Sequence, residues 1–208
     1  MNKNTRTVII AAIVALSLIT TIMALQQEQQ DKREIAQRQA AKQSTPTGQV
    51  AIGGEYVLTN QNGDKVDSKQ FLGKIQAVYF GFSNCPSICP TDLANITAVY
   101  KSLDDETKKN LQLVFITIDP ERDTPARLKE FLAGFDAPIM GLTGSAEEIS
   151  TVEKIFKVYS KKSTENSNEM EHSAFTYILG KDGKYSSHFG HNEDAKTIAA
   201  SIAELAKK

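Results

Sequence analysis

The chain has 208 residues, of which 40% are hydrophobic, and its 24 basic and 25 acidic side chains give a formal net charge of -1. This length is enough for one globular domain with an extension, and the near-neutral charge excludes a strongly basic nucleic-acid binder. Two cysteines exclude a disulfide framework and leave one thiol pair.

The N-terminal segment predicts a membrane anchor. Residues 8–25 form an uncharged apolar run that would make a helix of about 27 Å, close to the thickness of a bilayer's hydrocarbon core. A cleaved signal peptide is the alternative, but a cut after Ala24 would leave the bulky Ile22 where cleavage favours a small residue. The basic residues on the two sides do not decide the orientation. The expected organisation is a tail (1–7), a transmembrane helix (8–25), a polar Gln-rich linker (26–49) and a globular domain (50–208).

The predicted elements of the domain alternate between strands and helices. A hairpin around Asn62-Gly63-Asp64 opens it. Further strands are expected at 75–80, 111–118, 138–142, 174–179 and 185–189, and helices with apolar faces at 93–103, from 125 onward, at 146–159 and at 194–206. Two strand–helix units followed by a hairpin and a terminal helix predict an α/β domain of the thioredoxin-like class.

The two cysteines lie between the first long strand and the helix that follows it. Open α/β sheets place their sites at the carboxyl ends of strands, and the amides of a helix N-terminus lower a cysteine pKa. The spacing of Cys85 and Cys89 puts both sulfurs on one side of a helical turn. A structural disulfide here would close a very small loop and contribute only about 2 kcal/mol. The pair therefore predicts a functional site.

Two kinds of chemistry suit this pair. Thiolates select Cu(I), zinc or iron–sulfur clusters; zinc prefers four protein ligands, whereas Cu(I) is satisfied by two thiolates and one histidine. His172, just before the strand expected at 174–179, is the candidate third ligand, because the loop entering that strand should face the thiols. The same dithiol could instead exchange with a disulfide.

Charged and polar segments around the site add three expectations. Asp119 is expected near the thiols, and Arg122 and Asp123 as scaffold or partner contacts, with Asp123 also helping to cap the helix that Pro125 opens. The polar segment 161–171 has no apolar period. We expect it to be mobile and to position His172 only in the metal-bound protein.

Residues 52–205 resemble the Sco (SenC) family of membrane-anchored copper chaperones. The resemblance rests on an ordered set of motifs: Gly53-Gly54, FGFSNCPSICP (80–90), DPERDTP (119–125), GLTG (141–144), EHSAF (171–175) and HFG (188–190). It implies a thioredoxin-like fold, Cu(I) held by Cys85, Cys89 and His172, and delivery to the binuclear copper site of cytochrome c oxidase subunit II. It also implies a domain on the periplasmic or intermembrane-space side of a bacterial or mitochondrial inner membrane.

The sequence departs from the family pattern at two positions. Asn84 and Ser87 stand where members often carry a histidine and an acidic residue, so copper affinity is in question but ligation is not. The residues do not decide whether Cu(II) is also bound.

Three other functions are alternatives to copper delivery. A thiol–disulfide reductase acting on the oxidase's copper-ligand cysteines needs only the two cysteines, and other copper carriers or thiol–disulfide exchange proteins would be its partners. A peroxidase is disfavoured because Pro86 and Phe82 stand where peroxiredoxins carry Thr or Ser and Pro. A copper or redox sensor stays open.

Overall fold

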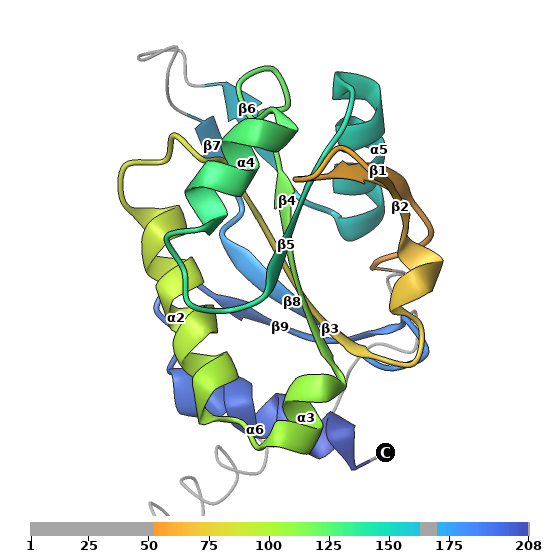
Figure 1. Cartoon of the computed structure of the whole chain (residues 1–208), viewed down its shortest axis with the longest axis vertical. Coiled ribbons are helices and arrows are strands. Elements are labelled where there is room, and N and C mark those ends of the chain that lie inside the picture. Colours follow the sequence, from red (N-terminus) through yellow and green to blue (C-terminus); the bar gives the residue numbers. More distant parts are fainter. Residues whose placement is uncertain (1–51, 163–169, 208) are drawn as a thin grey trace, which may run out of the picture. The chain divides into compact units, whose positions relative to one another are not determined.

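The computed structural model describes residues 52–162 and 170–207 (Figure 1). The predicted anchor at 8–25, the linker at 26–49 and the domain boundary at residue 50 lie outside these residues. Within the described ranges, no helix is both long and apolar enough to cross a membrane.

A seven-stranded sheet forms the centre of the domain. Its strands are β1 (Val57–Asn60), β2 (Lys65–Asp67), β3 (Ile75–Gly81), β4 (Leu111–Thr117), β5 (Ile139–Thr143), β8 (Phe175–Leu179) and β9 (Tyr185–Gly190). They are ordered β2-β1-β5-β4-β3-β8-β9, with β3, β4 and β5 parallel and the other pairs antiparallel. Every residue of β3 is buried, including Gln76, and the strand is otherwise apolar, because a central strand is covered on both faces.

Helices cover both faces of this sheet. They are η1 (Ser68–Phe71, a 3₁₀ helix), α2 (Ile88–Ser102), α3 (Asp105–Lys109), α4 (Pro125–Leu132), α5 (Ala146–Phe156) and α6 (Ala195–Ala206). In Figure 1, α2 and α4 lie on one side of the sheet and α5 on the other. Consecutive residues of β3 pack on opposite faces of the sheet. Tyr79 contacts Phe115, which contacts Phe131 of α4, whereas Phe80 contacts Phe156 of α5.

The structure confirms the predicted alternation of strands and helices and corrects three details. The helix expected at 146–159 ends at Phe156, because Lys157 takes the left-handed conformation (φ 57°) that commonly stops a helix. Asp123 does not cap α4: the Thr124 side chain accepts from the Arg127 amide, and Asp123 is fully buried. The short helices η1 and α3 were not predicted, since four or five residues carry too little periodicity.

A second, two-stranded sheet carries His172. It pairs β6 (Ser160–Lys162) with β7 (Met170–His172) in antiparallel register, with Ser160 opposite His172. The segment 161–171, expected to be mobile, therefore begins and ends in strands, and its middle, 163–169, lies outside the described residues. Two strands of three residues, polar apart from Met170, give no readable alternation, so the sequence did not indicate them.

Candidate metal centre

The thiol-bearing turn connects the carboxyl end of β3 to the first turn of α2. Cys89 is the second residue of α2 and is buried, and Cys85 is partly exposed in the turn before it. The side chain of Ser87, the N-cap residue, makes no capping hydrogen bond. Instead the Cys85 sulfur accepts from the Cys89 amide at 3.4 Å, so it lies at the positive end of the helix, where negative charge is stabilised.

Gly81 makes room for the buried sulfur. A Cβ atom at this position would lie 2.9 Å from the Cys89 Sγ and 2.9 Å from the Tyr79 ring. Tyr79 lies behind Cys89, and its burial, together with the charges of Cys89 and Asp92, raises its pKa, so it stays a neutral phenol. His191 Nδ1 lies 2.8 Å from Asp92 Oδ1. Sequence reasoning missed Tyr79, because it stands in a run of core strand residues.

The two thiols differ in acidity. A hydrogen bond from the Cys89 thiol, with smaller contributions from His172 and the amides of Cys89 and Ser87, outweighs burial and lowers the pKa of Cys85 to about 3. The same hydrogen bond, with burial, raises the pKa of Cys89 above its ordinary value. At neutral pH the pair therefore holds one thiolate, on Cys85, and one thiol, on Cys89.

His172 lies beside these sulfurs although it is 83 residues from Cys89 in sequence. Its Nε2 is 3.7 Å from the Cys89 Sγ, and its Nδ1 is 3.2 Å from the Ser173 carbonyl oxygen. A carbonyl can only accept, so Nδ1 is the nitrogen that donates to Ser173, and Nε2 is the ring nitrogen that faces the sulfur and can serve as a metal ligand.

The spacing suits a three-ligand centre. Metal–sulfur and metal–nitrogen bonds of about 2.3 and 2.0 Å at a trigonal angle separate the two donor atoms by about 3.7 Å, the distance found here between Cys89 and His172. In the part of the chain that the structure describes, no group of three or more His, Cys, Asp or Glu side chains is already arranged to hold a metal ion.

Asp123, which the sequence singled out, holds the thiol-bearing turn in place through hydrogen bonds. Asp123 accepts from the Ser83 amide, the Ser83 hydroxyl and the Thr117 hydroxyl at 3.0, 2.5 and 2.6 Å. This buried carboxylate thus ties the thiol turn to the end of β4, a scaffold role. Asp119 is buried and pairs with Arg122.

The remaining two histidines lie elsewhere. His188 Nδ1 is 2.5 Å from the Tyr185 hydroxyl, and its ring packs against Phe175. His191 pairs with Asp92 as described. His172 is therefore the histidine that the fold places against the thiols.

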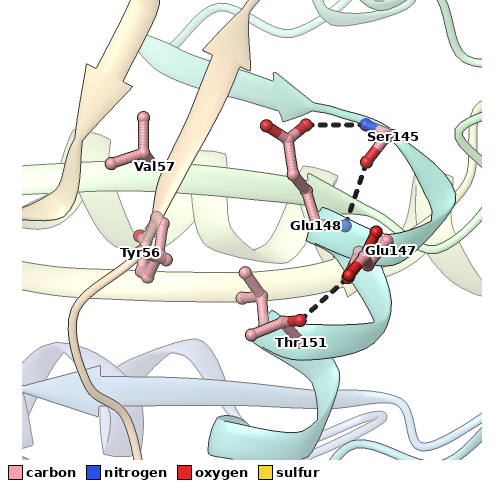
Figure 2. A pocket seen from close by; sticks show the side chains of 7 residues that line it. Tyr56, Val57, Ser145, Glu147, Glu148 and Thr151 are labelled. Carbon is pink, nitrogen blue, oxygen red and sulfur yellow. Dashed lines mark hydrogen bonds between the residues drawn. The ribbon is translucent and has the colours of Figure 1, made fainter.

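Two depressions lie away from the sulfurs. One, of about 220 Å³, is formed between β1 and the start of α5, where Glu148 and Ser145 make a reciprocal capping pair (Figure 2). The other, of about 150 Å³, lies between the turn after β4 and α5, and Asp119, Glu121, Glu153 and Lys162 contribute to its walls. Cys85, Cys89 and His172 line neither of them.

Comparisons with known proteins give a consistent result. A model of the SCO1/SenC family matches residues 44–207. A SCO2-like protein of Rickettsia prowazekii is 40% identical over 153 residues, which are 72% of this chain and 74% of that protein.

Solved structures agree. Bradyrhizobium japonicum ScoI with copper bound superposes with a TM-score of 0.68 at 37% identity, over 74% of this chain and 99% of that one. BsSco, described with a disulfide switch and as a member of the Sco family of cytochrome c oxidase assembly proteins, gives a TM-score of 0.64 at 27% identity, over 76% and 94% of the two chains. These likenesses confirm the predicted fold class.

Proposed function

This chain belongs to the SCO1/SenC family, and on that premise we propose that it is a copper chaperone for cytochrome c oxidase assembly. It binds Cu(I) through Cys85, Cys89 and His172 and delivers it to the binuclear copper site of subunit II. The observation that carries this proposal is the 3.7 Å approach of His172 Nε2 to the Cys89 sulfur. The likeness to a copper-bound ScoI supports copper as the metal.

The donor atoms of the three residues suit this cargo. The Cys85 thiolate and the His172 Nε2 donate to Cu(I), and Cys89 releases its proton as it binds. Exchange with a partner's disulfide would oxidise both sulfurs to a disulfide while the partner is reduced to a dithiol. That step removes both sulfur ligands, so the redox state of the pair controls loading.

The site of action in this proposal is the outer face of an energy-transducing membrane. Residues 8–25 anchor the chain in a bacterial or mitochondrial inner membrane, with the domain on the periplasmic or intermembrane-space side. The apolar run in the sequence supports this. Alkaline extraction tests it, because an anchored chain stays in the membrane pellet, whereas release into the supernatant would contradict it.

Copper stoichiometry tests the metal site. The detergent-solubilised full chain is loaded with Cu(I) anaerobically, both reduced and after oxidation of the thiol pair. About one copper per reduced chain and none per oxidised chain is expected, because the disulfide has no thiolate to donate. His172→Ala should bind more weakly, and His188→Ala, a matched control whose imidazole contacts Tyr185 and Phe175, should bind as the wild type does. No copper in the reduced wild type would overturn the proposal.

A thiol–disulfide reductase is the second candidate, and the acidity of Cys85 favours it. An acidic thiol beside a buried one is the arrangement of an attacking and a resolving cysteine. Reduction of a disulfide in subunit II would oxidise the pair by two electrons. This activity requires only the two cysteines, so His172→Ala should still reduce a model disulfide if the protein is a reductase alone, at a rate changed only by the smaller contribution of His172 to the low pKa of Cys85.

A further inference from the structure

The turn that follows β4 contacts the thiol-bearing turn through Asp123 and lies near His172 through Arg122 and Phe82. Within it, the amides of Arg122 and Asp123 donate to the Asp119 carbonyl at 3.2 and 2.9 Å, and the buried Asp119 carboxylate accepts from Arg122 Nε. These bonds fix the guanidinium of Arg122 relative to the backbone of the turn, because arginine presents its donors as a rigid planar group.

Arg122 lies over the ring of Phe82. Its Cζ is 6.0 Å from the ring centroid, the range of a cation–π contact. Phe82 is buried and in turn meets the imidazole of His172 in a T-shaped contact, with centroids 6.0 Å apart and planes at 82°. Arg122, Phe82 and His172 thus form a chain of contacts that runs from the turn to the imidazole whose Nε2 faces Cys89.

The backbone that carries His172 is held by neighbouring segments. In β6, Ser160 lies opposite His172 in register and donates to Glu153 of α5 at 2.5 Å. Lys162, also in β6, pairs with Glu121 of the same turn at 2.6 Å. These contacts hold β6, the strand with which β7 pairs, and in the closed pair Phe82 restricts rotation of the His172 side chain.

We propose that Arg122 is a positioning residue for His172: it fixes the Phe82 ring, and that ring holds the imidazole in the orientation that presents Nε2 to the metal. This inference rests on the proposed function, since it assigns Arg122 to the histidine arm of the same site. Residues that orient a metal-ligating histidine typically change metal affinity by about 10–100-fold when they are replaced.

The test is a double-mutant cycle on Cu(I) affinity, measured by competition with a chromophoric Cu(I) chelator in the reduced full chain. Arg122→Ala should weaken binding about tenfold, and Arg122→Lys should be intermediate, because it keeps a cation near Asp119 but loses the rigid planar guanidinium. Lys101→Gln is the matched control, because it removes an exposed ion pair near the far end of α2. In the His172→Ala background, Arg122→Ala should cost nothing further, because the group through which it acts is gone.

A second readout does not depend on copper. Nitrogen-15 NMR of the metal-free protein should show a single set of His172 ring signals in the wild type and averaged or shifted signals in Arg122→Ala and Arg122→Lys, with circular dichroism confirming that the variants are folded. Unchanged ring signals together with unchanged Cu(I) affinity would overturn the inference, as would an additive loss in the double variant. Those results would leave the proposed function standing if the wild type and His172→Ala still differ. A wild type that binds no copper would overturn the proposed function itself.

Discussion

Replacing Asp123 should destabilise the domain more than its position in a charged turn suggests. Asp123→Ala removes the acceptor of three buried hydrogen bonds, from the Ser83 amide, the Ser83 hydroxyl and the Thr117 hydroxyl. Bonds to a charged group contribute about 1.5–3 kcal/mol each, and an orphaned buried donor costs about 1–3 kcal/mol. The hydroxyls can partly turn to other acceptors, but the Ser83 amide cannot. The expected loss in the free energy of unfolding is therefore about 4 kcal/mol.

Asp123→Asn supplies the comparison that identifies the mechanism. Its amide oxygen can keep the bonds from the Ser83 amide and the Thr117 hydroxyl, and its amide nitrogen can donate to the Ser83 hydroxyl, so the loss should be about 1–2 kcal/mol. Urea denaturation measures both losses; by heat, Asp123→Ala should melt about 8–16 °C below the wild type. Thr124→Ala, which removes only the cap of α4, should cost about 1 kcal/mol. A loss below that of Thr124→Ala, or an Asn variant as unstable as the Ala variant, would refute this reasoning.

Three further predictions concern the site and Glu153 of α5, which accepts from Ser160 of β6. Gly81→Ala should cost about 1–3 kcal/mol by overpacking and weaken Cu(I) binding, because its Cβ would displace the Cys89 sulfur; denaturation and chelator competition measure both, and unchanged values would contradict the packing argument. Cys85 should be alkylated at a nearly constant rate between about pH 5 and 8, since its pKa is lowered to about 3; a rate that climbs throughout that range, followed by mass spectrometry, would show an ordinary thiol. Burial raises the pKa of Glu153, so ionisation disfavours the folded state and wild-type stability falls as pH rises through the folded-state pKa. Glu153→Gln, which can still accept from Ser160, should therefore be the more stable protein at neutral pH, with a difference that shrinks in acid; a constant difference would count against this.

The sequence predicted the parts of the domain whose signals are local. The apolar run of β3 and the placement of the thiols between it and α2 follow from periodicity and from where α/β sheets carry their sites. His172 was found because it precedes the strand β8, which pairs with β3. That choice depended on the expected topology and not on any motif around the histidine.

Other features escaped prediction because they depend on burial created by distant segments. Asp123 stands among charged residues, which is typical of an exposed turn, yet it is fully buried and accepts a hydrogen bond from the Ser83 amide of the thiol-bearing turn. The strands β6 and β7 are short and polar, so pairing between them leaves no apolar period. The cation–π contact of Arg122 with Phe82 joins residues 40 positions apart, and nothing in either segment alone indicates it.

The proposed ligands lie on two separate sheets, so they can dissociate from a metal one group at a time. Both sulfurs belong to a turn braced by the seven-stranded sheet, whereas His172 belongs to a pair of three-residue strands. Small, mostly exposed elements open at a lower free-energy cost than the core of a domain. Fraying of β6 from β7 would withdraw the imidazole while the thiols stay in place, leaving a two-coordinate ion with one side uncovered. In the proposed chaperone the cargo would therefore lose its nitrogen ligand first and its sulfur ligands afterwards, and an acceptor's ligand would enter at the position the imidazole vacates.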